Sequence, residues 1–455
     1  MIRPKILLAI ENEKPRRELI DIILKQDKEI DELKEKLKEL QKAKKKKFRL
    51  WAQAVHLNRS YSRKPGQKTG HPGIGRNIPG TIHRTVEESL RVCPDCRNPL
   101  NTPCDVLEHI QEDIVPAHTE VTLFKRYRYH CAHCHKKVTS LYHPEEIPNS
   151  KIGPHALIHM AILKYHHALP ANKIVELFSD LMDFKVSKGA VYQALERMSG
   201  WLQVEKKEIL KAIRKSPQIH MDETGWKING KGHWLWTAVN QRFAYYQIEK
   251  SRGALVPKKI IPTDYGGVLI TDFYSAYRNL PGRKQKCLVH LLREMRNCFE
   301  NDQTFEFWIH HKKLKRIIGD ALHLKERRAL FSLPHFKQRA GQIQSRLWLW
   351  ANRRYRNKRL KRLAKRFVTY WNDIFTFLEI PDVPFSNNLA ERMILPNVII
   401  RNRSYQNRTV SGAKAHEVFM SLIQTLKLRN ENPASWLKTA YLRHRQGNPT
   451  PLLTP

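Results

Sequence analysis

Three acidic residues, widely separated along the chain, have the types and settings needed to bind divalent metal ions. Asp222 lies in a strand-like stretch, residues 219–226, where apolar and polar side chains alternate. Asp272 ends a second strand-like run, residues 267–272, and Glu391 lies at the start of a helix. Carboxylate oxygens suit Mg²⁺ (or Mn²⁺), and such a set can hold two ions beside water and phosphate. The acids therefore predict a two-metal site for phosphoryl transfer.

Each acid also has a purely structural interpretation. Asp272 can cap the helix that follows it, and Asp222 at a strand end can accept hydrogen bonds from turn amides. Glu391 lies three residues after Asn388, which is the spacing of a capping box. Glu223 neighbours Asp222 in the same strand, so alternation points it to the opposite face and away from the metals.

The motifs around these acids resemble the successive signatures of the insertion-sequence sixty-six family of transposases, which belong to the DDE class. They are His220–Thr224, Asp272–Tyr277, Cys287–His290, Asn387–Arg392, Arg401–Arg403, Ser411–Ala415 and Ser421–Thr425. The similarity extends from about Arg63 to about Leu437. One departure is Ser386, where the family often has aspartate, and it bears on the helix cap more than on the metals.

This resemblance implies an α/β fold with an RNase H-like mixed-sheet core, in which Asp222, Asp272 and Glu391 hold two Mg²⁺ ions. It also implies a reaction in which the ends of a mobile element are nicked and the freed 3′-hydroxyls attack target DNA. The expected partners are double-stranded DNA (terminal inverted repeats and target), further copies of the chain, and small accessory proteins of the same element. The alternatives are a stand-alone RNase H-like nuclease and a catalytically inactive zinc-containing DNA-binding protein.

The order of predicted elements fits this core. A hairpin is expected from residues 233–239 and 243–248, and a further strand over 285–290. The long interval between Asp272 and Glu391 predicts a helical insertion at about 302–380. The helix of Glu391 is expected to end near Pro396.

The chain carries 82 Lys and Arg against 43 Asp and Glu, a formal net charge of +39. This excess favours a polyanionic partner, because each neutralised phosphate releases a counterion. No apolar run approaches the ~20 residues that span a bilayer, so a cytoplasmic, nucleoid-associated bacterial protein is expected. A basic run near residue 360 either tracks phosphates or forms a solvated face. The candidate DNA contacts are His290, Arg392, Arg353, Arg354, Arg356, Arg359, Arg362, Lys64 and Lys68.

Four of the seven cysteines form two CxxC pairs, Cys93 with Cys96 and Cys131 with Cys134. Four thiolates at this spacing suit a closed structural Zn²⁺ site, whereas a redox CxxC would not need a second copy. Arg97 and His135 follow the second cysteines, where the family often has glycine to ease the turn.

The remaining segments divide the chain. Residues 18–46 carry apolar residues at heptad spacing, which indicates a short coiled coil or a surface helix. The Gly/Pro-rich basic segment near Lys64 is either a DNA-following arm or a spacer. A predicted helix, turn and Ser187-capped helix are compatible with helix-turn-helix. The expected domains are 1–58 (coiled coil), 59–87 (linker), 88–150 (zinc), 151–215 (helix-turn-helix-like), 216–400 (catalytic core) and 401–455 (C-terminal helices and tail).

The cysteine pairs generate a first prediction, that the intact protein holds about one structural zinc per chain, as expected for four thiolates around one ion. Replacing Cys93 and Cys131 together with Ser should lower the zinc content, measured by elemental analysis, by about one ion. A fully folded, metal-free fragment of residues 88–150 would contradict it, since such sites contribute folding free energy.

Overall fold

The computed structural model describes residues 81–447 apart from 88, 101–104, 108, 110, 112–114, 116 and 303. The predicted coiled coil and the candidate contacts Lys64 and Lys68 lie outside the described residues and stay predictions. The chain divides into two compact units, residues 1–113 and 114–455. The described part of the first contains the first CxxC pair and an antiparallel bridge between Val92 and Pro99.

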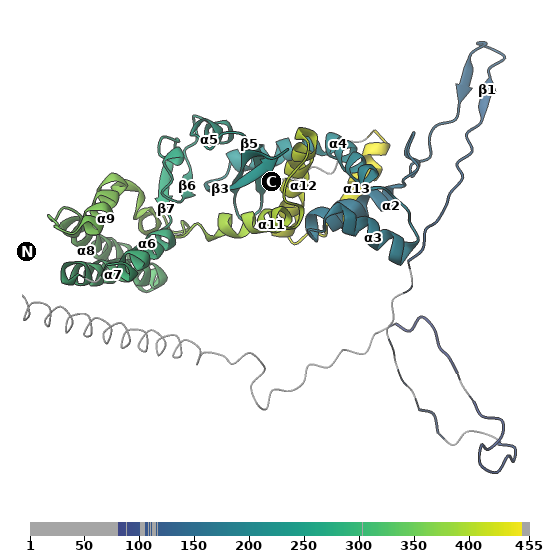
Figure 1. Ribbon diagram of the computed structural model, residues 1–455, viewed down its shortest axis with the longest axis horizontal. Coiled ribbons are helices and arrows are strands. Elements are labelled where there is room, and N and C mark those ends of the chain that lie inside the picture. Colours follow the sequence, from purple (N-terminus) through teal and green to yellow (C-terminus); the bar gives the residue numbers. More distant parts are fainter. Residues whose placement is uncertain are drawn as a thin grey trace, which may run out of the picture. The chain divides into compact units, whose positions relative to one another are not determined.

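The second unit contains a small hairpin of β1 (Arg128–His130) and β2 (Lys137–Thr139) (Figure 1). The strands are antiparallel, with Arg128 opposite Thr139. The second CxxC pair lies in the connection between them, at the turn of the hairpin.

Within the described residues, four helical segments precede the sheet. They are α2 (Pro154–Ala161), its π-helical continuation η2 (Ile162–His166), α3 (Ala171–Met182) and α4 (Lys188–Arg214). Asp183 ends α3 in the left-handed conformation (φ 46°), and the Ser187 hydroxyl caps α4 by accepting a bond from the Ala190 N–H (3.1 Å). The predicted break and cap are therefore confirmed. However, α4 has 27 residues and packs on the sheet, so it is much longer than a recognition helix needs.

The sheet contains β3 (Gln218–Ile228), β4 (Lys231–Val239), β5 (Ala244–Glu249), β6 (Val268–Thr271) and β7 (Arg283–Lys286), with α5 (Leu255–Ile260) between β5 and β6. Its spatial order is β5-β4-β3-β6-β7. The first three strands are antiparallel neighbours, whereas β6 runs parallel to both β3 and β7. This five-stranded mixed sheet with helices is compatible with an RNase H-like core.

One edge of the sheet is closed by the helix α12 (Val410–Leu428). Glu417, Ser421 and Thr425 recur every four residues on α12 and accept bonds from alternate N–H groups of β5. These bonds run from Ile248 (2.7 Å), Tyr246 (3.0 Å) and Ala244 (3.0 Å), respectively. Every fourth residue of a helix lies on nearly the same side, and every second N–H of a strand points the same way, so the three side chains meet the three N–H groups. These N–H groups are therefore not free to pair with another strand.

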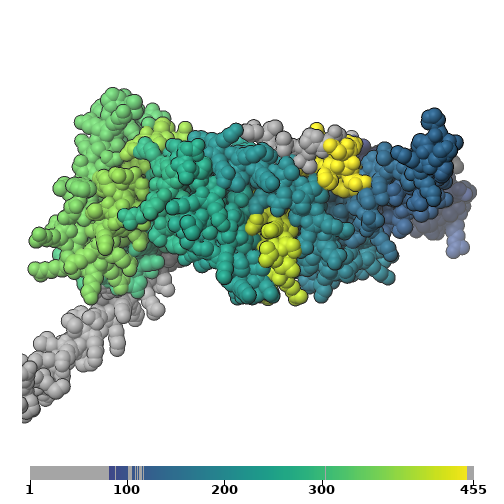
Figure 2. Space-filling model, turned by 90° about the horizontal axis from the view of Figure 1, so that it is seen from above, coloured from purple at the N-terminus to yellow at the C-terminus, as the bar shows by residue number. Residues whose placement is uncertain are grey.

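Two hydrophobic clusters meet at β6. Leu269 belongs to the cluster shared by β3–β5, α4 and α12, while Val268 and Ile270 belong to that of the helical insertion. Strand alternation therefore lets one short strand join both. The insertion, green in Figure 2, gathers beside the teal residues of the sheet. The helices of the insertion are α7 (Phe305–Glu326), α8 (Leu333–Ala351), α9 (Lys358–Thr369) and α10 (Thr376–Glu379), and α6 (Leu288–Glu300), which precedes it, shares its hydrophobic cluster.

Two predicted boundaries are wrong. The strand expected over 285–290 ends at Lys286, because the buried Leu288, Leu291 and Met295 follow helical spacing and begin α6 instead. The helix α11 (Asn388–Ser404) continues through Pro396. Its packing on β3 and β4 outweighs the local cost of the proline, and the Tyr246 hydroxyl donates to the Met393 carbonyl (2.6 Å) within the turn that contains Pro396.

The chain ends, among the described residues, with α13 (Pro433–Arg445). None of the helices in the described segments is both long and apolar enough to cross a bilayer.

The edge contact of α12 generates a second prediction. Thr425→Val keeps the side-chain shape but removes the acceptor of the buried Ala244 N–H. The free energy of unfolding, measured by urea denaturation, should fall by about 1–3 kcal/mol, the cost of an unsatisfied buried donor. Thr439→Val, at an exposed position of α13, is the matched control and should change it little. Equal stability of the two variants would show that the contact contributes nothing.

Candidate metal and DNA site

Asp222 lies within β3 and not at its end, because β3 runs on to Ile228 beside β4. The pairing of β3 with β6 stops at His220, two residues earlier. Asp222 therefore lies just beyond the point where β3 and β6 separate, while Thr237 of β4 remains opposite it. Its Oδ1 accepts a bond from the Glu223 N–H (2.9 Å).

Asp272 directly follows the last residue of β6, and β6 is the strand next to the β3 strand of Asp222. Its Oδ1 accepts a bond from the Tyr274 N–H (2.9 Å), which is a local turn contact. The cap role weighed from the sequence is not formed, because the short helix that follows (Ser275–Tyr277) has Tyr274 as its N-cap residue. Its backbone carbonyl accepts a bond from the buried Lys286 ammonium (2.8 Å), which also donates to the Thr271 hydroxyl (2.8 Å). Burial lowers the pKa of Lys286 to about 8. Lys286, the last residue of the neighbouring strand β7, thus holds the end of β6 in place.

Glu391 lies in the first turn of α11, whose N-cap residue is Asn387. The capping box weighed for Asn388 and Glu391 is not formed, because the N-cap residue is Asn387 and its side chain makes no cap bond. The Asn387 N–H donates to the Cys287 Sγ (3.1 Å). The Asn387 amide donates to the Met221 carbonyl (2.8 Å) and its oxygen lies 3.1 Å from His220 Nδ1. Since burial lowers the pKa of His220 to about 4, this ring is neutral and donates from Nδ1.

The three acids are electrostatically coupled. Burial, together with the negative charges of Glu223, Asp272 and Glu391, raises the pKa of Asp222 to about 7. A cation at this point would remove the cost of burying several like charges together. Asp272 and Glu391 thus lie close enough for their charges to act on Asp222, and the three acids come from two strands and one helix.

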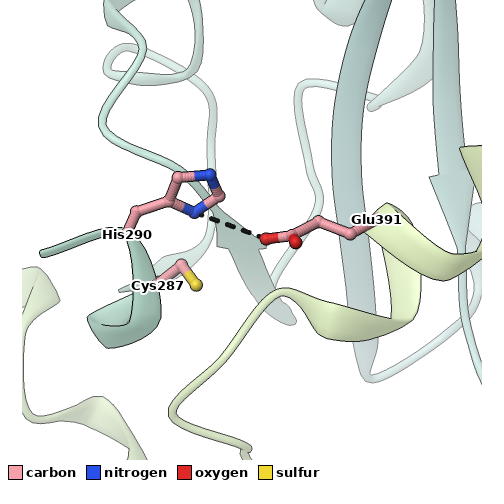
Figure 3. A group of neighbouring side chains, drawn as sticks. All are labelled: Cys287, His290 and Glu391. Carbon is pink, nitrogen blue, oxygen red and sulfur yellow. Dashed lines mark ion pairs between the residues drawn. The ribbon is translucent and has the colours of Figure 1, made fainter. Parts of the chain in front are cut away.

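One set of donors lies close enough for a single ion, as far as the described residues show: Cys287, His290 and Glu391, whose ligand atoms are all within 4.8 Å of one another (Figure 3). The His290 Nδ1 lies 3.5 Å from the Glu391 Oε1. Both atoms are buried and lack a hydrogen-bond partner within the described part of the chain. The candidate phosphate contact His290 therefore lies beside the third acid.

Glu223 is held by partners of its own. Its carboxylate accepts bonds from Arg252 Nη2 (2.8 Å) and from the Tyr277 hydroxyl, and its side chain is only 2% exposed. Burial raises its pKa, whereas the Tyr277 and Arg252 hydrogen bonds lower it. Glu223 is thus occupied in fixing Arg252, although it lies close enough to add to the charge felt by Asp222.

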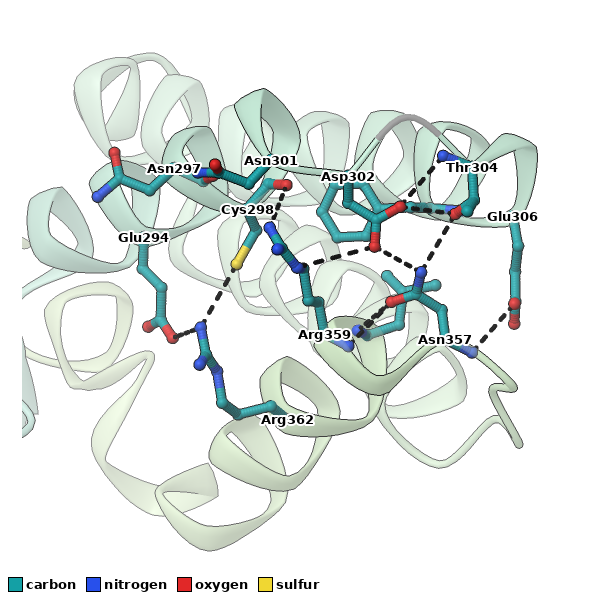
Figure 4. Close-up of polar contacts among 12 residues, drawn as sticks. Glu294, Asn297, Cys298, Asn301, Asp302, Thr304, Glu306, Asn357, Arg359 and Arg362 are labelled. Atoms are coloured by element: carbon teal, nitrogen blue, oxygen red, sulfur yellow. Dashed lines mark hydrogen bonds and ion pairs between the residues drawn. The ribbon is translucent and has the colours of Figure 1, made fainter.

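Arginines surround a cavity of about 610 Å³ beside Asp272. Arg359 and Arg362 reach from α9 towards α6, where Arg359 Nη1 donates to the Cys298 carbonyl (3.3 Å) and Arg362 Nη2 pairs with Glu294 (3.3 Å) (Figure 4). Glu294 balances part of this charge. The lining includes Asp272, Phe273, Tyr274, His290, Arg252, Arg293, Glu294, Arg359, Arg362 and Arg366. The cavity therefore lies between Asp272 and the arginines of α9.

The other candidate DNA contacts are divided over the surface. Arg353 and Arg354 line a second hollow of about 590 Å³ with Lys361 and Lys365. Arg356 is exposed next to it, and its backbone N–H donates to Glu306 (2.9 Å). Arg392 is exposed beside Glu391 on α11. The basic residues near position 360 therefore line two separate hollows of the insertion and do not form one surface.

The two CxxC pairs adopt the same turn. The N–H of Arg97 donates to the Cys93 carbonyl and that of His135 to the Cys131 carbonyl, each at 2.9 Å. Arg97 (φ 59°) and His135 (φ 56°) both have the left-handed conformation that glycine adopts most easily. Hydrogen bonds from the following backbone, led by Cys96 and Cys134 respectively, lower the pKa of Cys93 and Cys131. The zinc ion stays a prediction.

Several site residues were not identified from the sequence alone. Asn387 and Cys287 belong to motifs already quoted, but no role was assigned to them. Lys286 and Arg252 carried no signal, since isolated basic residues are common in this chain and their importance depends on neighbours from other elements.

The chain is similar to one protein family and to two further proteins of known sequence. The model of a family described as "Transposase IS66 family" matches residues 149–415. Uncharacterized protein y4jD of Sinorhizobium fredii is 24% identical over 399 residues, covering 80% of this chain and 77% of that protein. Uncharacterized protein y4qI of the same organism is 22% identical over 368 residues, covering 74% and 68%, respectively.

The raised pKa of Asp222 generates a third prediction. The folded state holds its proton up to about pH 7, and the unfolded state releases it near 3.8, so stability falls as pH rises between these values. In magnesium-free buffer, Asp222→Asn should therefore gain stability over the unaltered protein between pH 4 and pH 8, measured by urea denaturation. Added Mg²⁺ should reduce that gain. Parallel stability profiles for the two proteins would contradict the burial of this charge.

Proposed function

Because the chain belongs to the Transposase IS66 family, we propose that it is the DNA transposase of an insertion sequence. It binds the terminal inverted repeats of its element and catalyses Mg²⁺-dependent strand cleavage and strand transfer. The observation that supports this proposal is the position of Asp222 just beyond the point where β3 and β6 separate, next to the β6 end that leads into Asp272, which lines an arginine-rich cavity.

Asp222, Asp272 and Glu391 are the residues that would hold two Mg²⁺ ions (or Mn²⁺). When bound, such ions supply activation of a water or a DNA 3′-hydroxyl and stabilisation of the leaving oxygen. The protein's own part is to fix these carboxylates. Asn387 anchors the helix of Glu391, and Lys286 anchors the strand end of Asp272.

The arginines beside Asp272 would bind the phosphates that flank the cleaved bond. Arg359, Arg362 and Arg366 project from one helix, and a guanidinium can bind phosphate through two parallel N–H groups. Phe273 lies beneath the Arg366 guanidinium (5.0 Å), so an apolar surface adjoins the charges. The +39 net charge supports DNA binding over a larger area, together with Arg353, Arg354, Arg356 and Arg392.

The outlying segments would assemble the DNA complex. A zinc held by the CxxC pairs would keep the zinc-binding segment folded, and the heptad segment would join copies of the chain. Lys64 and Lys68 would follow the DNA backbone, and α3 and α4 are the candidate helix-turn-helix. Accessory proteins of the same element are further proposed partners, and a bacterial cytoplasm is the proposed location.

Two alternatives use the same surfaces. A catalytically inactive zinc-containing DNA-binding protein would not need the three acids, which are all present here. A stand-alone nuclease of the same fold would cleave without joining ends. Inverted repeats flanking the coding DNA, and strand transfer in vitro, separate the transposase from both.

A fourth prediction tests the catalytic acids. Asp222→Asn, Asp272→Asn and Glu391→Gln keep side-chain size and remove the charge that balances the cations. Each should lower the rate of cleavage of terminal-repeat DNA about a hundredfold or more, because bound metal supplies several kcal/mol and each 1.4 kcal/mol is tenfold. DNA binding, measured by gel shift, should persist and weaken with rising salt.

Two controls accompany these variants. Glu223→Gln alters the neighbouring acid of the same strand and should retain more activity than Asp222→Asn. Asp320→Asn breaks an exposed pair with Arg346 in the insertion and should leave cleavage unchanged. Normal cleavage by Asp222→Asn together with loss in Glu223→Gln would move the first catalytic acid to Glu223. Normal cleavage by all three acid variants would exclude the mechanism.

A further inference from the structure

A second group of donors adjoins the proposed magnesium ligands. Cys287 is the N-cap residue of α6 and His290 lies in its first turn, so their spacing of three places both on one side of the helix. Glu391 reaches them from the first turn of α11 (Figure 3). The sulfur, a ring nitrogen and a carboxylate oxygen all lie within 4.8 Å of one another.

Two of these ligand atoms lack a hydrogen-bond partner among the described residues. The His290 Nδ1 and the Glu391 Oε1 are buried without a hydrogen bond among the residues that the structure describes. They lie 3.5 Å apart, which is too long for a good N–H···O bond. An unpaired buried polar atom typically costs about 1–3 kcal/mol. A cation bound between the two atoms would satisfy both of them.

The third donor is held ready by the main chain. The Asn387 N–H donates to the Cys287 Sγ (3.1 Å), which fixes the position of the sulfur. Burial raises the pKa of this thiol, and the Asn387 bond opposes part of that rise. The same asparagine anchors α11 to β3, so the donors of both helices are fixed by one residue. The three ligands therefore come from a rigid part of the molecule and not from a loop.

The donor types indicate which ion fits. A thiolate, an imidazole and one carboxylate are ligands of Zn²⁺ and related transition metals, whereas Mg²⁺ prefers oxygen donors alone. Three protein ligands with an open fourth position is the arrangement of catalytic zinc sites. His290 also lines the arginine-rich cavity, so a water or a phosphate oxygen can approach the group from that side.

We propose that Cys287, His290 and Glu391 bind one zinc-class divalent ion, with the fourth position open to water or phosphate. The site is separate from the CxxC pairs and shares Glu391 with the proposed magnesium site. The sharing, but not the site itself, rests on the proposed function. When both ions are present, a zinc-class ion and Mg²⁺ therefore compete for Glu391.

The experiment titrates the full-length protein with Co²⁺, whose absorption reports thiolate ligation, and counts the bound ions by elemental analysis. Cys287→Ser and His290→Gln should each bind about one ion fewer than the unaltered protein, and Cys287→Ser should also lose part of the thiolate-to-cobalt band. Cys298→Ser is the matched control, because Cys298 is another buried cysteine of α6 and should keep the ion. His290→Gln changes a partly exposed residue and keeps the test valid where Cys287→Ser fails to fold.

The outcomes are distinct. Co²⁺ binding that is unchanged in both Cys287→Ser and His290→Gln would overturn the site. Asp222→Asn should keep the ion, since Asp222 is not one of its ligands. Excess Mg²⁺ should weaken Co²⁺ binding to the unaltered protein. Loss of the ion in the two ligand variants without Mg²⁺ competition would uphold this site and count against the proposed sharing with magnesium.

Discussion

A single buried asparagine links the parts of the molecule that form the site. Asn387 bonds the Met221 carbonyl and His220 on β3 through its side chain, and the Cys287 sulfur at the start of α6 through its backbone. All of these groups are buried, so breaking one bond would leave a polar atom without water or protein partner. The position of Glu391 relative to Asp222 depends on this residue.

The helical insertion has its own hydrophobic cluster, yet it is not an independent appendage. Val268 and Ile270 of β6 belong to its core, and Leu269 between them belongs to the core of the sheet. A movement of the insertion would therefore disturb the strand that carries Asp272. Because the arginines of α9 are attached to this second core, their distance from the acid is fixed by packing and not by attraction between charges.

A group of negatively charged side chains lies next to a group of positively charged ones in the candidate site. Burial and the neighbouring negative charges raise the pKa of Asp222 to about 7, while the cavity next to Asp272 is lined by arginines. Coulomb attraction draws cations to the first group and phosphates to the second. Glu294 and Glu223 tie some of these arginines in place, which orders the guanidinium groups without neutralising them all. The arrangement suits a substrate that carries its negative charge in a chain of phosphates.

The sequence by itself determined the residue types, the family resemblance and most elements near the site. The alternation around Asp222, the Ser187 cap and the helical periodicity of the insertion are local signals, since each depends only on neighbours in the chain. Where two local signals overlapped, sequence reasoning failed. Residues 287–290 fit a strand as well as a helix, and Pro396 was expected to end a helix that continues to Ser404.

Tertiary structure alone decided which side chains meet. The side-chain bonds of Asn387 join residues more than 160 positions apart, and Lys286 gains its role only because β7 lies beside β6. Likewise, Cys287, His290 and Glu391 became one donor group when α6 and α11 were placed together. Such contacts depend on the packing of buried surfaces between distant segments, which no local pattern of residues encodes.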